Sequence, residues 1–204
     1  MHKEILTKEQ IELLPLIKLF SDDFGLVGGT AIALHMGHRR SIDFDLFTYR
    51  DFDNLIIRRK IKKNNIRIDN VIVDKLDEFT SIVKGVKLTF FHFPYKISYP
   101  EKLGYMLKFS DLLTLAAMKA FSLGRRAKWK DYVDLYFIMK DYYKIGEIVK
   151  KAEHIFSVEF NEKIFRTQLA YFEGVNYTEK VICMSGFEID DEIIKKKLIE
   201  FSLS

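Results

Sequence analysis

The sequence predicts an α+β protein in two parts: a mixed sheet with flanking helices, followed by a helical bundle. Short apolar or alternating runs separated by turn residues recur through residues 24–93, as is typical of strands. From Ser110 onward, apolar residues recur at helical spacing instead. The stretch 94–104, which holds two prolines and a glycine, lies between these patterns. We therefore predict one domain over residues 1–100 and a second over residues 101–204.

Three helices and five strands are expected in the first domain. The expected helices are residues 8–20, 31–36 and 52–63, and the expected strands are residues 24–27, 41–48, 66–74, 78–84 and 86–93. Thr7 and Gln10 have the spacing of a capping box, so the first helix should begin there, and Pro15 should bend it. Gly37 should close the second helix. Lys84-Gly85 is predicted as the hairpin turn between the last two strands.

The second domain should consist of helices. LLTLAAMKAFSL, KDYVDLYFIMKDYY and the segment from Ile145 to Ala152 carry helical patterns. A closing helix is expected after Asp190 as its cap, with Ile194, Leu198 and Phe201 on one stripe.

Composition narrows the class of protein. The chain has 204 residues, 48% of them hydrophobic and 30% charged, with 10 Gly and 3 Pro, which excludes collagen-like and mainly disordered classes. Its one cysteine, Cys183, forms no Cys/His metal pattern. The net charge of +4 permits an anionic partner without requiring one. No apolar run of about 18 residues and no leader-like start are present, so a cytoplasmic protein with no membrane contact is expected.

Two aspartates are one part of the most informative signal in the sequence. Asp43 and Asp45 are two positions apart in an expected strand, so both should project from one face with Cα atoms roughly 6.5 to 7 Å apart. Mg²⁺ favours one or two carboxylates together with substrate phosphates. We therefore expect this pair to bind Mg²⁺, with Mn²⁺ as an alternative.

Gly28-Gly29-Thr30 stands between an expected strand and an expected helix. Glycines there let backbone N–H groups approach phosphate oxygens, and the helix N-terminus favours negative charge. A glycine pair is more often a plain turn, and an Asp-x-Asp pair is often a chance surface feature. Their occurrence together, in the order strand, glycines, helix, acidic strand, favours a site where a metal-bound triphosphate lies between them.

These residues carry a resemblance to a known family. Gly28–Ala31 and His38–Phe47 are similar to the signature of the AbiEii/AbiGii nucleotidyltransferase toxins, members of the DNA polymerase β-like superfamily. Similar elements follow in VKLTFFHFPY, DLLTLAAMKAFSLGRRAKWKDYVDLY and QLAYFEG, so the likeness spans about residues 24–174. It implies a nucleotidyltransferase core followed by a helical domain that completes the active-site cleft.

The resemblance also implies a function. Nucleotide would pass from an NTP to an acceptor hydroxyl, with release of pyrophosphate. Related toxins belong to type IV toxin–antitoxin or abortive-infection systems, and some modify the acceptor end of tRNA. The expected partners are therefore NTP, RNA and a cognate antitoxin. Two alternatives remain: a catalytically silent nucleotide-binding or interaction module, and a nucleotidyltransferase that modifies a small molecule such as an antibiotic.

Further charged residues are candidates for the site. Lys119 lies in a run that is apolar on nearly every face, so its ammonium group needs an anion, and its family position suggests contact with triphosphate. Asp131 and Asp134 share a helix face; by resemblance Asp131 is the catalytic candidate, either orienting Lys119 or activating the acceptor hydroxyl. Arg39 is expected to clamp triphosphate, because guanidinium matches phosphate oxygens. Ser41 either binds phosphate or satisfies the entry turn.

One departure from the family concerns a third carboxylate. Polymerase β-like enzymes commonly carry one on a later strand, and the expected strand 86–93 has no acid. Asp69 or Asp74 are the substitutes that the sequence offers. Without such a base, positioning and metal electrostatics would supply most of the rate.

Overall fold

The computed structural model describes residues 1–204 and separates into two compact units. The first unit comprises residues 1–37 and 41–111, and the second comprises residues 38–40 and 112–204. The main division therefore lies after residue 111 and not after residue 100 as predicted. The expected link, residues 94–104, contains the first of two short strands, 101–103 and 107–109, that complete the first unit's sheet, which explains the difference.

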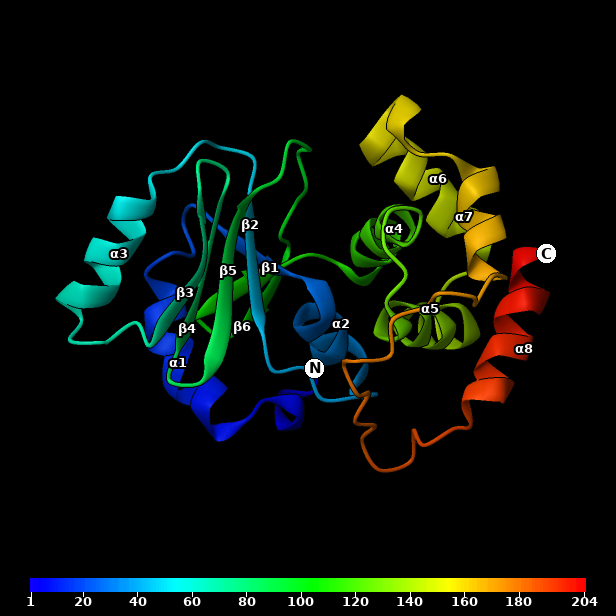
Figure 1. Cartoon of the computed structure of the whole chain (residues 1–204), viewed down its shortest axis with the longest axis horizontal. Coiled ribbons are helices and arrows are strands. Elements are labelled where there is room, and N and C mark those ends of the chain that lie inside the picture. Colours follow the sequence, from blue (N-terminus) through cyan, green and yellow to red (C-terminus); the bar gives the residue numbers. More distant parts are fainter. The chain divides into compact units, whose positions relative to one another are not determined.

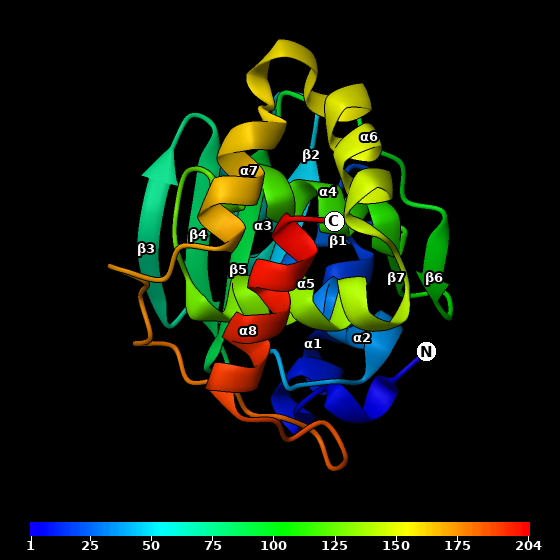
Figure 2. The same ribbon diagram turned by 90° about the vertical axis from the view of Figure 1, so that its right-hand side faces the viewer.

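Seven strands form one mixed sheet in the first unit (Figure 1). Their order is β3-β4-β5-β2-β1-β7-β6, which the strand labels of Figure 2 follow from left to right. They are β1 (Gly25–Val27), β2 (Phe44–Thr48), β3 (Asn70–Lys75), β4 (Glu78–Val83), β5 (Val86–His92), β6 (Glu101–Leu103) and β7 (Leu107–Phe109). The β2–β5 and β1–β7 pairs are parallel, and the other pairs are antiparallel. The predicted α+β class, a mixed sheet with helices, is confirmed.

The hairpin between β4 and β5 has the predicted turn. Lys84 and Gly85 both have positive φ, 49° and 75°, and the flanking Val83 and Val86 are paired across the strands. Two central residues with positive φ are characteristic of the type I′ turn, whose twist matches that of a hairpin.

The helices of the first unit are the 3₁₀ helix η1 (Lys3–Ile5), α1 (Lys8–Lys18), α2 (Gly28–Met36) and α3 (Asn54–Lys63). Thr7 and Gln10 form the predicted capping box, and Gly37 ends α2 in the left-handed conformation. Phe20, which follows α1, packs edge-to-face on Phe90 of β5, with ring centroids 4.8 Å apart. The core of this unit thus lies against the sheet face that carries Phe90.

The start of the acidic strand differs from its prediction. Strand β2 begins at Phe44 and not at Ser41, and Ile42 is 57% exposed. The buried Thr30 of α2 donates its hydroxyl hydrogen bond to the backbone carbonyl of Asp43. Because residues 41–43 are held by helix α2 in this way, they do not join the ladder of β2.

Helices make up nearly all regular structure of the second unit, as predicted (Figure 2). They are α4 (Leu112–Leu123), α5 (Trp129–Asp141), α6 (Ile145–Phe156), the 3₁₀ helix η2 (Ser157–Glu159), α7 (Glu162–Leu169) and α8 (Asp191–Ser202). Helix α4 packs against α5, α6 and α7, and α8 packs against α5 and α7. Asp190 caps α8 as predicted, with Ile194 and Leu198 buried. None of the helices combines the length and apolar character needed to cross a membrane.

Candidate functional site

The two predicted metal ligands lie at the start of β2. Asp45 is paired in register with Val27 of β1 and Thr89 of β5. Its side chain is directed away from the core face, because the flanking Phe44 and Leu46 are fully buried on that face. Asp43 directly precedes the strand, and its carboxylate is 2.8 Å from Nζ of Lys87. The face opposite the core therefore carries both carboxylates.

The glycine turn lies directly against this pair. Gly28 has a φ of +71°, which favours glycine, and a Cβ built there would overlap Oδ2 of Asp45. Helix α2 begins at Gly28 itself, and its N-cap residue, Val27, makes no side-chain capping bond. The first backbone N–H groups of a helix have no partner within it, so those of Gly28, Gly29 and Thr30 are donors beside a carboxylate. The structure brings together the two motifs that the sequence singled out.

Thr30 and Ser41 connect these motifs through their side chains. The Thr30 hydroxyl lies 3.0 Å from Oγ of Ser41, in addition to its bond to the Asp43 carbonyl. This contact fixes the backbone that carries Asp43 relative to the first turn of α2. Thr30 was predicted to bind nucleotide, and Ser41 either to bind phosphate or to satisfy the entry turn; the structure shows their hydroxyl groups bonded to one another.

Lys87 is a charged neighbour that sequence reasoning missed. It lies on β5, the parallel neighbour of β2, and its Nζ meets Asp43. The alternation of residues 86–92 places Lys87 and Thr89 on one face of β5, which is a readable signal, but the pairing of β5 with β2 has no local signature. The strand in which a third carboxylate was sought thus presents a cation to the acidic pair.

Asp69 and Asp74, the predicted substitutes for a third carboxylate, lie elsewhere. Both are at the β3 side of the sheet, and β4 and β5 separate them from β2, a distance of roughly 14 Å over three strand spacings. Asp74 accepts hydrogen bonds from Asn54 and Arg58, at 2.7 and 2.5 Å, which lower its pKa. Asp69 accepts the N–H of Gly85 at 3.2 Å. The structure does not bring either aspartate to the acidic pair.

Asp134 is the centre of a buried charge cluster in the second unit. Its carboxylate accepts hydrogen bonds from Nε2 of His38 at 2.8 Å and from Nε and Nη2 of Arg39 at 2.7 and 2.8 Å. Nζ of Lys119 lies 3.0 Å away. Burial alone would raise the pKa of Asp134, but the charges of Arg39 and Lys119 and the bonds from His38 and Arg39 hold it well below its usual range. The carboxylate is therefore ionised.

Lys119 meets the anion that its apolar surroundings require. It pairs with both Asp131 and Asp134 of α5 and is only 5% exposed. Burial lowers the pKa of Lys119, but the two carboxylates outweigh it and raise the pKa above its ordinary value. Of the two roles predicted for Asp131, the geometry favours the orientation of Lys119. Nε of Arg126 lies 3.3 Å from the second oxygen of Asp131.

Arg39 is engaged within the protein. Its Nε and Nη2 bind Asp134, its Nη1 donates to the carbonyl of Arg40 at 3.0 Å, and its side chain is 4% exposed. In this arrangement the guanidinium fork that was expected to clamp a triphosphate holds a carboxylate instead. The predicted site residues thus form two groups, one in each unit: Gly28, Gly29, Thr30, Ser41, Asp43 and Asp45, and then Arg39, Lys119 and Asp131.

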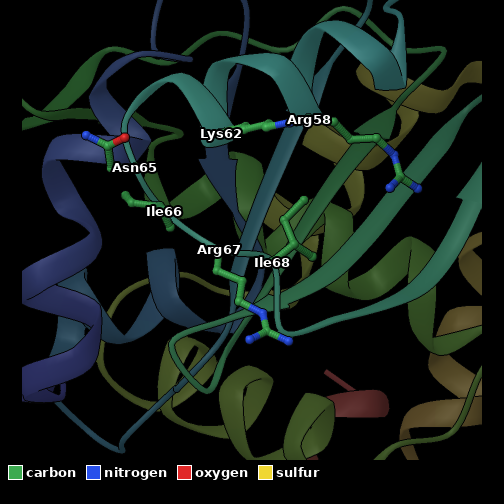
Figure 3. A pocket seen from close by; sticks show the side chains of 6 residues that line it. All are labelled: Arg58, Lys62, Asn65, Ile66, Arg67 and Ile68. Atoms are coloured by element: carbon green, nitrogen blue, oxygen red, sulfur yellow. The ribbon is translucent and has the colours of Figure 1, made fainter.

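A basic hollow of about 450 Å³ lies beside α3 and the loop that follows it (Figure 3). It is lined by Arg58, Lys62, Asn65, Ile66, Arg67 and Ile68. Lys62 and Arg67 have no acidic partner, whereas Arg58 pairs with Asp74 and lies over the ring of Phe79. The hollow contains no carboxylate for a metal, so it is not a candidate for the reacting centre.

Sequence comparison gives one well-covered relative. The chain is 32% identical to the Uncharacterized protein aq_aa25 of Aquifex aeolicus (strain VF5) over 208 aligned positions, which cover 96% of this chain and 97% of the relative. No protein-family model matches the chain.

Solved structures share the fold at low sequence identity. A candidate nucleotidyltransferase from H. pylori has a TM-score of 0.62 at 15% identity and covers 100% of this chain and 95% of its own. JHP933 from Helicobacter pylori has a TM-score of 0.65 at 16% identity, covering 97% and 92%. MenT4, a nucleotidyltransferase toxin from Mycobacterium tuberculosis H37Rv, has a TM-score of 0.56 at 13% identity, covering 95% and 82%. The chain therefore has the fold seen in these structures.

Proposed function

We propose that this chain, which belongs to the same family as the Aquifex aeolicus protein aq_aa25, is a nucleotidyltransferase. It moves a nucleoside monophosphate from an NTP to an acceptor hydroxyl and releases pyrophosphate. The observation that carries the proposal is the contact between the carboxylate of Asp45 and the glycine start of α2. Two of the solved structures with this fold bear the name nucleotidyltransferase in their titles.

The chemistry of the residues fits a divalent metal. Asp43 and Asp45 supply hard oxygen ligands on one face of the sheet, and Mg²⁺ prefers such a pair completed by phosphate oxygens. Bound there, Mg²⁺ or Mn²⁺ would neutralise charge on the phosphates and on the leaving pyrophosphate. The N–H groups at the start of α2 are suited to bind phosphate oxygens, and Lys87 adds positive charge beside Asp43.

The remaining charged candidates have supporting roles in this proposal. Asp131 fixes the position of Lys119, and Asp134 holds Arg39, so that both cations are ordered within the second unit.

For the acceptor and the biological role we propose RNA, specifically the acceptor end of tRNA, and a toxin of a type IV toxin–antitoxin or abortive-infection system. The resemblance to the AbiEii/AbiGii toxins supports both, as does the toxin named among the structures that share the fold. The net charge of +4 agrees with an anionic acceptor. A cognate antitoxin is the partner that this role implies.

Transfer of label from each α-³²P-NTP to total RNA tests the proposal. We expect labelled RNA with the wild type and none with the Asp43→Ala/Asp45→Ala variant. A matched control replaces two exposed acids of the same unit that form no ion pair, Asp22→Ala with Asp77→Ala, and should label as the wild type does. Equal labelling by wild type and the Asp43/Asp45 variant would refute the proposal.

A second candidate function is a catalytically silent nucleotide-binding module of the same fold. The observation that favours it is Lys87, a cation on the strand where a third carboxylate was sought. Calorimetric titration with each NTP and Mg²⁺ separates the two functions. Binding without transfer to RNA, protein or a small-molecule hydroxyl favours the silent module. Transfer to an antibiotic would identify a nucleotidyltransferase that modifies a small molecule.

A further inference from the structure

Two phenylalanines continue the face of the sheet that carries the acidic pair. Strands β2 and β5 are parallel, with Asp45 opposite Thr89 and Phe47 opposite Phe91. Because alternate side chains share a face, Phe47 and Phe91 lie on the same face as Asp45, two residues further along their strands. The step of two residues is roughly 7 Å. Together the two rings form what we call the aromatic platform.

The rings of the platform contact each other and a third aromatic side chain. Phe47 and Phe91 have ring centroids 5.0 Å apart, and Phe47 and Phe93 have centroids 5.3 Å apart. The backbone beneath them is fixed, because the Tyr99 hydroxyl donates to the Phe47 carbonyl at 2.9 Å and the Phe93 N–H donates to the Thr48 carbonyl at 2.7 Å. The platform is therefore held in place before any ligand arrives.

The core of the sheet does not account for these two rings. On the opposite face the neighbouring Phe44, Leu46 and Phe90 are 0 to 1% exposed, whereas Phe47 and Phe91 are both only partly buried. Large aromatic side chains left partly exposed beside candidate phosphate ligands are suited to stack on a planar group. Every nucleobase has such a π-face, and stacking tolerates differences in base identity.

We infer that Phe47 and Phe91 stack on a nucleobase whose phosphate or hydroxyl group lies at Asp43 and Asp45. The inference rests on the proposed nucleotidyl transfer and adds a site for the base to it. The two-residue distance between Asp45 and Phe47 is one that a ribose can span between a phosphate and a base. The base belongs either to the NTP or to the terminal nucleotide of the acceptor, and the two sources share this chemistry.

Fluorescence of 2-aminopurine, which stacking quenches, tests the platform without requiring turnover. One arm uses 2-aminopurine riboside triphosphate with Mg²⁺, and the other uses an RNA oligonucleotide with 2-aminopurine at its 3′ end. We expect quenching in one arm with the wild type. The Phe47→Leu/Phe91→Leu variant should lose the quenching and bind that probe about 10- to 100-fold more weakly. The arm that responds identifies the source of the base.

Three controls exclude a loss of structure as the cause. Phe90→Leu removes a similar ring from the opposite, buried face and should leave quenching unchanged in the folded protein. Phe91→Tyr keeps a π-face and should restore binding relative to Phe91→Leu. Inorganic triphosphate, which has no base, should bind the double-leucine variant as it binds the wild type. In transfer assays the double-leucine variant should raise the KM of the responding substrate more than it lowers kcat.

Equal quenching and equal affinity of wild type and the double-leucine variant in both arms would overturn the platform, as would a Phe91→Tyr variant that behaves like Phe91→Leu. Failure of the proposed function is a different outcome. In that case the wild type transfers no label, yet platform-dependent quenching of the nucleotide probe still supports the base site.

Discussion

The two charge clusters of this protein use the same pairing of carboxylate and cation at different degrees of burial. In the first unit, the side chains of Asp43 and Lys87 are 20% and 35% exposed. In the second unit, Asp134 is completely buried and its partners Arg39 and Lys119 are 4% and 6% exposed in their side chains. In a half-exposed ion pair, the carboxylate can leave its lysine for another cation, because water stabilises both charges when they separate. A buried cluster cannot, so the first arrangement suits ligand binding and the second suits structure.

Removal of Asp134 should give the largest loss of stability. Asp134→Ala leaves the charges of Arg39 and Lys119 without this partner in the interior, which we expect to lower the free energy of unfolding by about 3 to 5 kcal/mol. Urea denaturation followed by circular dichroism measures the change. Asp141→Ala, at an exposed position of the same helix, serves as the control and should cost less than about 0.5 kcal/mol. A similar cost for both variants would contradict the distinction between the clusters.

The acidic pair of the first unit should show the opposite balance. Asp43→Asn with Asp45→Asn keeps the shape of the side chains, so we expect nucleotide transfer to fall by at least about 100-fold while the free energy of unfolding changes by less than about 1 kcal/mol. Transfer assays and urea denaturation on the same preparation measure both. A destabilisation as large as that of Asp134→Ala would show that the pair is structural.

Acid should destabilise the protein through the buried cluster. Burial lowers the pKa of His38 despite its bond to Asp134. Below the ordinary histidine pKa of about 6.5, the unfolded chain therefore binds a proton that the folded protein does not bind. Stability should therefore decrease as pH falls below about 6.5, and again below about 3.9, where the depressed pKa of Asp134 has the same effect.

Thermal denaturation between pH 8 and pH 4.5 measures the histidine step. The His38→Gln variant removes this group, so its Tm should depend less on pH between 6.5 and 5 than that of the wild type. Identical pH profiles for the two proteins would mean that His38 is not the group responsible.

The smallest effect on stability is expected for Lys87. Lys87→Ala removes a half-exposed ion pair and should change the free energy of unfolding by less than about 1 kcal/mol. Because Lys87 competes with a metal for Asp43, its removal should tighten Mn²⁺ binding several-fold, which paramagnetic relaxation of water protons measures. Lys87→Arg keeps the charge and should retain the wild-type affinity. Weaker Mn²⁺ binding by Lys87→Ala would indicate that Lys87 supports the metal site.

Local sequence signals predicted much of the fold. The capping box at Thr7, the turn at Lys84-Gly85 and the cap at Asp190 each act within a few residues, and the structure confirms all three. The sequence also predicted that the glycine turn and the acidic pair lie on either side of one site, and Asp45 does contact Gly28. A strand, a tight turn and a short helix separate the two motifs, so the chain can return beside the turn.

Features that depend on distant residues could not be predicted in this way. Arg39 meets Asp134, which is 95 positions later in the chain, so its buried ion pair has no local pattern. The approach of Lys87 to Asp43 requires the parallel pairing of β5 with β2, which nothing in either strand specifies. Strands β6 and β7 have three residues each, too few for an alternation to be recognised, and the domain boundary was placed too early for that reason.

The assignment of residues 38–40 to the second unit affects any attempt to divide the chain. The polypeptide leaves the first unit after Gly37, returns at Ser41 and leaves again after Asp111. A fragment ending at Asp111 would carry His38 and Arg39 without their carboxylate, and a fragment starting at Leu112 would carry Asp134 without them. Neither fragment is a complete folding unit. Limited proteolysis or split expression at this junction should therefore yield two poorly folded pieces. For this reason, full-length protein should be used for every assay.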